Sequence, residues 1–562
     1  MKNLIKSIFF LYLIIQCSFG CQDKESQLKE ELKNIELLRG DIILCSGKKF
    51  GDVNFSLSCD ISVRETFDLA LSLLHSFQYT EAEKAFVKII DIDPECAMAY
   101  WGVAMSIYHA AWFPPSEDEL SKVSQVLKVA ESVNQTSKES DYLAAINSFY
   151  NNWKDLDHNT RAKKYELKVE ELHSKYPEDT EAAILYSLAL YSTRDRVGKK
   201  YHNERKAGLI LEKLFKEQPN HPGIAHYIIH NYDNPVLAVN GLDVARRYAE
   251  IAPGSSHAQH MPSHIFTRLG LWEESIQSNL KSISAVKCFV EEAGINGHYF
   301  EEVHAMDYMV YAYLQMGDNL HAIEQYQTLK NIHDFYPMNI TAATYPLASI
   351  PTRIALENKN WKAAANLDIQ ETSINWEDFP WQKAILHFGR ALGAAHTQDY
   401  IKAEKEIGIL KHLKKILANN NDPTTSNQIN QIMIQVKSAE AWLSFSKGNQ
   451  KEGLALMKEA ALLESRTSKH PVTPGDVIPA DELLGDMLLK MNKSEEALKV
   501  YEKNLKAHPN RFNGVYGAAL AAKNIGNKKE AKKHFKNLLK ITASIESDRP
   551  ETLEARRYLN SI

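Results

Sequence analysis

The 562-residue chain lacks the short motifs that mark common catalytic and nucleotide-binding sites. It has no Gly-rich phosphate loop, no G-x-S-x-G elbow, no H-E-x-x-H pair and no C-x-x-C motif. Positive charge is not in excess, because 66 Lys and Arg stand against 71 Asp and Glu, a net charge of −5. We therefore expect no nucleic-acid partner. After the first 20 residues no apolar run approaches the roughly 18 residues of a membrane span, so the rest is expected to be soluble.

The N-terminus resembles a targeting signal. In "MKNLIKSIFFLYLIIQCSFGC" two lysines precede a short apolar run, and Ser18-Phe19-Gly20-Cys21 resembles a bacterial lipobox. We predict that residues 1–20 are a lipoprotein signal peptide and that Cys21 becomes the lipidated N-terminus, which makes lipid the only membrane anchor. Simple secretion is the alternative. The following Gln22–Glu25 resembles the short acidic tags of surface lipoproteins, so we expect the outer face of the outer membrane, with a periplasm-facing anchor as the alternative.

Cysteine is scarce, with six residues in the whole chain. Cys45 and Cys59 bracket a Gly-containing, non-helical stretch within residues 21–60, which we interpret as a tether and an N-terminal cap. Outside the cytoplasm these two cysteines could form a disulfide that staples the start of the fold. Two buried free thiols are the alternative.

A 34-residue period runs through the chain from residue 61 to the end, with irregular joins near 113–140, 193–203, 233–242 and 338–350. In "DELLGDMLLKMNKSEEALKVYEKNLKAHPNRF", Gly485, Ala497, Tyr501 and Pro509 occupy repeat positions 8, 20, 24 and 32, and Ala531 follows Ala497 by 34 residues. The pattern resembles the tetratricopeptide repeat (TPR). Small residues at 8 and 20 let two antiparallel helices approach closely, and the proline ends the second helix. We predict an all-α, TPR-type right-handed α-solenoid of about ten helix pairs over residues 61–562.

The repeat register places a group of histidines on one face. Successive repeats begin at Pro222, Ser256 and Val303, and positions 2, 5 and 9 of the first TPR helix line the concave groove. The side chains at these positions within residues 222–311, together with one arginine at position 13, are His226, His230, His257, His260, His264, His304, Asp307, Tyr311 and Arg268. Residues four apart share a helix face, so we expect these side chains to converge on one concave pocket. Pro262 suits the first turn of a helix, which could leave His257 in the preceding loop.

Three long segments resemble one bacterial branch of TPR proteins. They are "HPGIAHYIIHNYDNP", "SSHAQHMPSHIFTRLGLWEESIQSN" and "VHAMDYMVYAYLQMGD", and "CAMAYWGVAM" and "TPGDVIPADELLGDML" fit the same branch. The resemblance covers most of the chain. It implies the fold and links the histidine blocks, and it implies no activity, cofactor or catalytic residue.

Three interpretations of the histidine pocket stay open on the residues alone. The imidazoles could bind zinc or copper, with Asp307 as a ligand or as a hydrogen-bond partner of a ligand. They could instead form a metal-free pocket in which Arg268 and Tyr311 help to bind, or act on, an anionic or sugar-like ligand. They could also be a structural network in which each ring bonds to a carbonyl. The Pro-rich stretch from His470 to Glu482 is interpreted as a stiff linker or as a cover over the groove.

A lipid-anchored TPR solenoid is typical of a binding or scaffold module. We therefore expect protein partners, or a small polar or glycan ligand, in the concave groove. By analogy with surface lipoproteins that capture glycans, an accessory role in polysaccharide utilisation or degradation is the expected context. A metal-dependent or His acid/base enzyme that uses the pocket is the alternative function.

Overall fold

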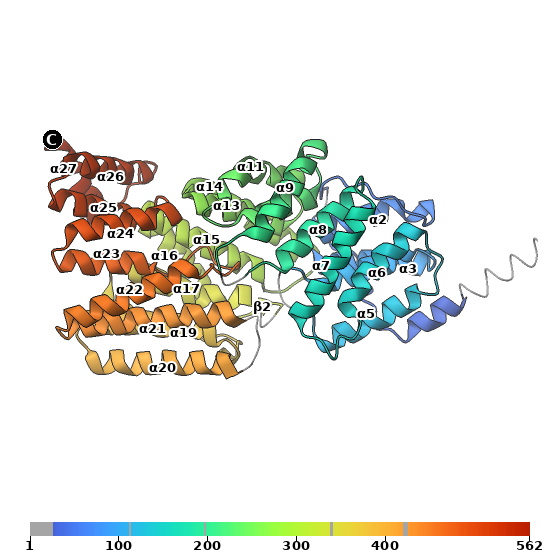
Figure 1. The fold of residues 1–562 in the computed structure, drawn as a ribbon, viewed down its shortest axis with the longest axis horizontal. Coiled ribbons are helices and arrows are strands. Elements are labelled where there is room, and N and C mark those ends of the chain that lie inside the picture. Colours follow the sequence, from blue (N-terminus) through green and yellow to red (C-terminus); the bar gives the residue numbers. More distant parts are fainter. Residues whose placement is uncertain (1–25, 46, 112–113, 196–197, 338–340, 420–424) are drawn as a thin grey trace, which may run out of the picture. The chain divides into compact units, whose positions relative to one another are not determined.

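The computed structural model describes residues 26–45, 47–111, 114–195, 198–337, 341–419 and 425–562. The predicted signal peptide and Cys21 lie outside these ranges. The described chain is a succession of antiparallel helix pairs, interrupted by two short parallel strands, β1 (His298–Tyr299) and β2 (Phe335–Tyr336) (Figure 1). The predicted all-α, TPR-type solenoid is confirmed. Among the described helices, none combines the length and the apolar character that a membrane crossing requires.

The helices group into two compact units, and each is described by itself. Unit 1 contains the described residues up to Arg194, with His202–Asn231 and Glu250–Ser255. Each helix from α2 to α8 packs on the next, and α4 packs on both α2 and α6, as expected for stacked helix pairs. Its elements are η1 (Ile61–Val63), α2 (Arg64–His75), α3 (Tyr79–Ile92), α4 (Ala97–Tyr108), α5 (Glu117–Ala130), α6 (Ser137–Tyr150), α7 (His158–Lys175), α8 (Thr180–Ser192), α9 (His202–Glu217) and most of α10 (Pro222–Tyr232).

Unit 2 contains Asp195–Tyr201, Tyr232–Ala249 and Ser256–Ile562. Its elements are η2 (Ala238–Gly241), most of α11 (Leu242–Ile251), α12 (Ser256–His260), α13 (Pro262–Leu269), α14 (Trp272–Glu292), α15 (Phe300–Met316), α16 (Asn319–Lys330), α17 (Thr341–Glu357), α18 (Trp361–Ala365), η3 (Trp376–Asp378), α19 (Pro380–His396), α20 (Tyr400–Asn419), α21 (Ser426–Ser446), α22 (Gln450–Arg466), α23 (Ala480–Lys490), α24 (Ser494–Ala507), α25 (Phe512–Asn524), α26 (Lys528–Ile541) and α27 (Pro550–Asn560).

In both units, the 34-residue period includes a contact between an aromatic ring and a glycine. The aromatic residue at repeat position 24 packs against the glycine at position 6 of the next repeat. A Cβ atom on Gly102 would lie 2.2 Å from the ring of Phe86, and one on Gly517 would lie 2.3 Å from the ring of Tyr501. Glycine is therefore required at these two junctions between consecutive helix pairs.

The segment before the first repeat packs on unit 1 as a cap. Phe55 is buried and its ring lies 5.3 Å from that of Tyr142 between centroids. The predicted Cys45–Cys59 disulfide is wrong, because Cys59 is bonded to Cys96, with the two Cα atoms 4.7 Å apart. The cap runs back along the helix ends and brings Cys59 beside the turn that precedes α4. Spacing along the sequence could not reveal this neighbour.

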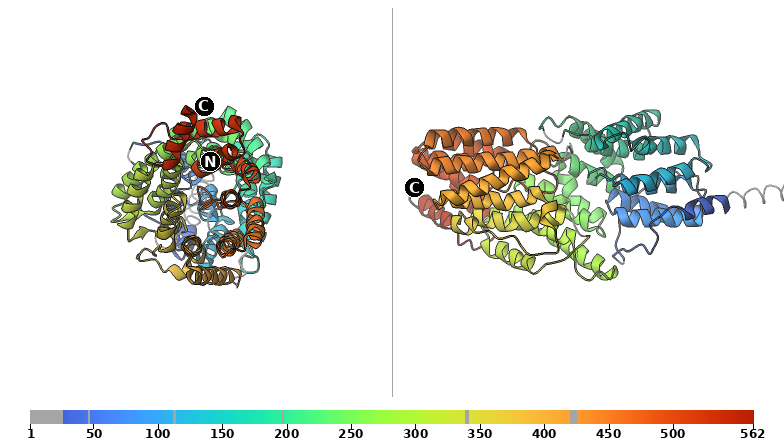
Figure 2. Two further views of the ribbon diagram at one scale, coloured as in Figure 1. Left: turned by 90° about the vertical axis from the view of Figure 1, so that its left-hand side faces the viewer. Right: turned by 90° about the horizontal axis from the view of Figure 1, so that it is seen from below.

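Unit 2 curves until it meets itself. Its inner helices α15, α17, α19, α21, α23 and α25 pack on one another in order, and α25 also contacts α15. The backbone N–H of Phe512 donates a hydrogen bond to Oε1 of Gln315, 3.1 Å away, at this closure. The left view of Figure 2 shows the yellow-to-red helices around a common centre.

Residues 468–479, here called the central strap, run along the inner helices of unit 2. Three inner side chains donate hydrogen bonds to three consecutive strap carbonyls. Tyr308 Oη lies 3.1 Å from the oxygen of Thr473, Arg268 donates to that of Pro474, and Arg353 Nη2 lies 3.0 Å from that of Gly475. Of the two interpretations of this Pro-rich stretch, the cover over the groove is the one that the contacts match.

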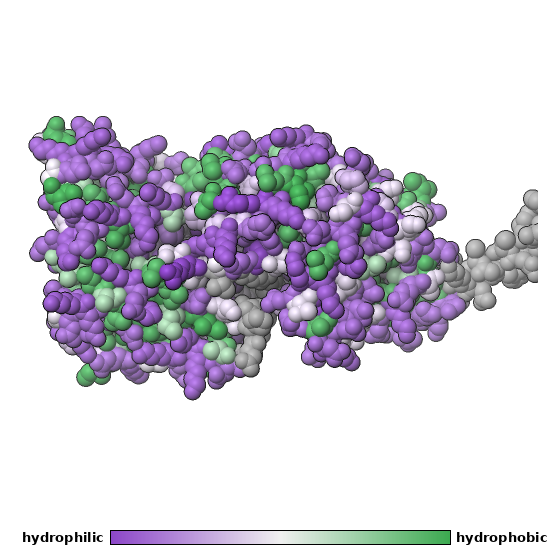
Figure 3. Space-filling view, in the orientation of Figure 1, coloured by the Kyte–Doolittle hydropathy of each residue, from purple (hydrophilic) through white to green (hydrophobic). Residues whose placement is uncertain are grey.

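The molecular face in Figure 3 is mostly hydrophilic, with hydrophobic residues scattered over it. Single exposed apolar residues are ordinary on a protein surface and carry no functional information. The face drawn in Figure 3 therefore gives no sign of a binding surface.

Candidate functional site

The histidine-rich stretch of unit 2 forms two helices rather than one. Pro262 occupies the first turn of α13, where its missing N–H costs nothing. His257 and His260 lie on the preceding five-residue helix α12, so His257 is helical rather than in a loop. His264 and Arg268 lie on α13, and His304 lies on α15.

Three of the predicted histidines come together in unit 2. One nitrogen from each of His260, His264 and His304 lies within 4.8 Å of the other two. The Nε2 atoms of His260 and His264 are 3.0 Å apart, and the ring of His304 lies 4.5 Å from that of His260 between centroids. The repeat register placed these three side chains on one face, and the structure brings them together.

Two side chains that the sequence did not single out orient these rings. Nδ1 of His260 lies 2.7 Å from Oδ1 of Asn279, and Nδ1 of His264 lies 2.9 Å from Oδ2 of Asp233. Asp233 directly follows α10, which ends in His230-Asn231-Tyr232. Asn279 lies on α14, the helix after α13. Neither residue belongs to a recognisable sequence pattern, because each meets its histidine only when the helices pack together.

Burial and mutual repulsion keep these imidazoles neutral. Burial, with the neighbouring His304 and His264, holds the pKa of His260 well below its usual value. Burial lowers the pKa of His304 to about 3. Burial alone would raise the pKa of Asp233, but Lys469 and His264 outweigh it and lower the value to about 2. Neutral rings beside an ionised carboxylate are the protonation states in which histidine binds metals.

The central strap closes over this cluster. Lys469 Nζ lies 2.6 Å from Oδ2 of Asp233 and 2.9 Å from the carbonyl oxygen of Thr473. The hydroxyl of Tyr308 lies 3.3 Å from His264 as well as contacting the strap. Arg268 is 5% exposed and bridges Asp233 and the strap carbonyl of Pro474. The group is therefore enclosed rather than open to the groove.

Asp307 and Tyr311 belong to a second buried network. Asp307 accepts hydrogen bonds from Ser349, at 2.7 Å, and from Arg353. The hydroxyl of Tyr311 accepts a hydrogen bond of 2.8 Å from Arg511, which is also ion-paired with Glu482. Burial raises the pKa of Asp307, although Arg353 opposes the shift. The Asp307 carboxylate therefore pairs with an arginine rather than with the imidazoles of the cluster.

His257 faces an acidic neighbour on α15. Its Nδ1 lies 4.0 Å from Oε1 of Glu301, and Ser256 donates a hydrogen bond to the same carboxyl group. Burial raises the pKa of Glu301 to about 7, against the hydrogen bond from Ser256. Glu301 was not predicted, and its position one turn before His304 gives no signal of its own.

In unit 1, His226 and His230 lie side by side on α10, with ring centroids 4.7 Å apart. Nδ1 of His226 donates to the carbonyl oxygen of His75, 2.7 Å away. Both rings also pack on Phe77, at 4.3 and 5.4 Å. That these two histidines share one pocket with those of unit 2 stays a prediction.

His75 is part of a buried group in unit 1. Glu181 accepts from Nε2 of His75 at 3.0 Å and from Nε2 of His221 at 2.8 Å. Burial would raise the pKa of Glu181, but the two histidines lower it far below its usual range. Each of its two oxygens already accepts one hydrogen bond from a ring nitrogen, so the facing groups are matched donors and acceptors.

Comparison with known proteins yields structural likeness only. No protein-family model matches the chain, and no curated protein matches it. Similar solved structures include the human IFIT1 dimer with PPP-AAAA, at 13% identity, TM-score 0.34, and coverage of 86% of this chain and 91% of that one. They also include the APC/C hetero-tetramer Cut9–Hcn1, at 12% identity, TM-score 0.27, and coverage of 88% and 96%. The TPR-type assignment therefore rests on the helix pairs and the repeat register of this chain.

Proposed function

We propose that the protein is an exported, lipid-anchored binding module whose docking site is a cleft in unit 2. The signal-like N-terminus and the lipobox-like Ser18–Cys21 support export and anchoring. The Cys59–Cys96 disulfide is consistent with an oxidising compartment. The central strap fills the inner face of unit 2, so a partner has to bind elsewhere.

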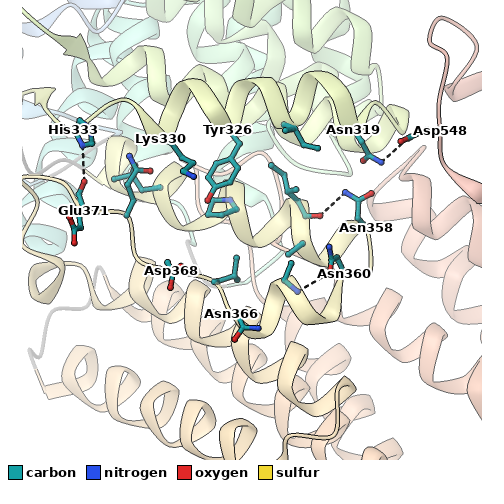
Figure 4. A pocket seen from close by; sticks show the side chains of 18 residues that line it. Asn319, Tyr326, Lys330, His333, Asn358, Asn360, Asn366, Asp368, Glu371 and Asp548 are labelled. Carbon is teal, nitrogen blue, oxygen red and sulfur yellow. Dashed lines mark hydrogen bonds between the residues drawn. The ribbon is translucent and has the colours of Figure 1, made fainter.

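The observation that carries this proposal is an open cleft of about 700 Å³ beside α16. It exists because α18 has only five residues, whereas the equivalent helix of the next repeat, α20, has 20. The missing turns leave the sides of α16 and α17 uncovered. Figure 4 shows Tyr326 and Lys330 pointing from α16 into the cleft, with Asp368 across from them.

The residues that line the cleft are suited to bind a partner's apolar side chain with basic groups beside it. Ile323, Leu347, Pro351 and Ile354 supply apolar surface, and Ile323 is 44% exposed. The charged residues of the lining are Lys330, Asp368, Glu371 and Asp548, an excess of negative charge. An apolar cleft with an acidic rim is complementary to a protein segment that carries a hydrophobic side chain beside Lys or Arg.

A protein partner is favoured over a glycan because four of the five side-chain amides that line the cleft already donate a hydrogen bond within the protein. The side-chain amides of Asn358, Asn366 and Gln370 donate to backbone carbonyls of the protein. A sugar site would need such donors free. A role beside polysaccharide-degrading proteins is the cellular context that we infer for such a partner, by analogy alone.

The acid/base alternative gains no support from the geometry. Each histidine, aspartate and tyrosine predicted for unit 2 is bonded inside the fold or lies under the strap. A substrate would have no open route to these groups in the described chain.

Site-specific photo-crosslinking in the native host tests the cleft. A photoreactive residue in place of Ile323 or Tyr326 should give the same discrete protein adduct. The same residue in place of Lys499, exposed on α24, should not. The purified partner should then bind the Ile323→Asp variant at least about tenfold more weakly, while the stability of this surface variant changes by less than about 0.5 kcal/mol. Identical adducts from all three positions, or a captured glycan instead of a protein, would contradict the proposal.

A further inference from the structure

The hydrogen bonds around His260 and His264 determine which ring nitrogens carry protons. Asn279 donates its Nδ2 to the carbonyl oxygen of Ser275, 2.8 Å away, which fixes the amide so that Oδ1 faces His260. An amide oxygen can only accept, so Nδ1 of His260 must carry a hydrogen. Nδ1 of His264 likewise donates to the carboxylate of Asp233.

In the neutral rings, both Nε2 atoms are then unprotonated and carry lone pairs. They face each other at 3.0 Å in a buried place. Two lone pairs at that distance repel unless a cation lies between them. Zinc–nitrogen bonds of about 2.0–2.1 Å in a tetrahedral site put neighbouring nitrogens about 3.3 Å apart. The observed separation is within a few tenths of an ångström of that value.

His304 completes the group from a third helix. Its Nδ1 is buried and makes no hydrogen bond within the described part of the chain. A buried imidazole nitrogen without a partner is unfavourable, and coordination of a metal ion would satisfy it. The three rings come from α12, α13 and α15, and Asp233 and Asn279 supply the outer hydrogen bonds typical of metal-binding histidines.

We propose that His260, His264 and His304 bind one divalent transition-metal ion, zinc in the first place, which ties three helices together beneath the central strap. Three imidazole nitrogens without sulfur favour Zn²⁺, or Cu²⁺ as the runner-up, over Cu⁺. The enclosure under Lys469 and Tyr308 makes the site structural rather than catalytic. This inference does not depend on the cleft at α16 or on its partner.

The contrast with the His75–Glu181–His221 group of unit 1 sharpens the assignment. There the Nε2 atoms of both histidines donate to one carboxylate, so every facing pair is a donor with an acceptor. In unit 2 the facing pair consists of two acceptors. Only the second arrangement needs a cation.

Cobalt binding to the mature protein, stripped with a chelator, tests the site. Wild type should take up one Co²⁺ with visible d–d absorption bands, and zinc should displace it. His304→Gln is the key variant because it removes the third imidazole at a position whose Nδ1 makes no hydrogen bond within the described residues. It should lose the bands and bind at least about 100-fold more weakly. Asn279→Leu, which removes an outer hydrogen bond, should weaken binding about 10- to 100-fold.

Two histidines serve as matched controls. His387→Gln changes a buried histidine of the same unit that pairs with Glu406, and His534→Gln changes a member of a separate His/Glu group. Both variants should keep the wild-type bands and affinity. The proposal is overturned if stripped wild type binds no cobalt, which would leave a shared proton between the two rings. It is also overturned if His304→Gln binds like wild type, or if His534→Gln abolishes binding.

Discussion

Substitution of Gly475 by alanine tests whether the central strap is an integral part of unit 2. A Cβ atom there would lie 2.8 Å from the hydroxyl oxygen of Tyr311 and 3.1 Å from its Cζ. Tyr311 cannot swing aside, because Arg511 donates to its hydroxyl at 2.8 Å and the guanidinium of Arg353 lies 5.2 Å from its ring centroid. The strap must therefore move instead.

The size of the effect follows from that displacement. To reach ordinary contact at 3.4 Å from 2.8 Å, the strap must shift by about 0.6 Å. The same shift lengthens the 3.0 Å hydrogen bond from Arg353 to the carbonyl of Gly475 beyond hydrogen-bonding range. Loss of a charged hydrogen bond costs about 1.5–3 kcal/mol, and overpacking costs about 1–3 kcal/mol. Since the shift relieves part of the overpacking, we expect a loss of about 2–4 kcal/mol in the free energy of unfolding of unit 2.

Urea denaturation combined with hydrogen exchange of the strap amides measures this loss. The control is Gly408→Ala on α20, where a Cβ meets nothing within 4 Å. That change should stabilise the protein by up to about 1 kcal/mol through helix propensity. Adding Tyr311→Phe to Gly475→Ala should recover part of the loss. If Gly475→Ala unfolds within 0.5 kcal/mol of wild type and its strap amides exchange no faster, the strap is not held as described.

Three further changes address other parts of the molecule. Gly102→Ala should cost about 1–3 kcal/mol by thermal denaturation, because its Cβ would overlap Phe86. In the double variant, Phe86→Leu should offset this cost rather than add to it. If the two losses of stability simply add, the contact between the repeats is not as described. Replacing Cys59 and Cys96 by serine should cost about 4 kcal/mol in thermal denaturation against oxidised wild type, from the entropy of a loop with a sequence separation of 37, and an unchanged melting temperature would refute this. The pKa of Glu301 is raised to about 7, so the folded state holds a proton that the unfolded chain releases near 4.5, and stability falls as pH rises between these values. Glu301→Gln should remove that decline and exceed wild type by about 3 kcal/mol at pH 8; equal pH profiles of the two proteins would refute it.

Local sequence patterns predicted the repeats and the three clustered histidines of unit 2. A 34-residue period is visible because each helix pair needs the same small and aromatic residues at the same places. His260 and His264 lie four residues apart, and the register adds His304 from the next inner helix. Such inferences require only helix geometry and the contact between neighbouring repeats.

Tertiary structure alone decided what surrounds those histidines. Tyr308 meets Thr473 across 165 residues, and Arg268 meets Pro474 across 206, because unit 2 closes until α25 contacts α15. The closure turns a predicted open groove into an interior filled by the strap, and it commits Asp307 to Arg353. A repeat pattern specifies how one helix pair sits on the next. How many pairs stack before the chain meets itself, and which segment fills the centre, depends on the accumulated curvature and on contacts between distant residues, which no local pattern encodes.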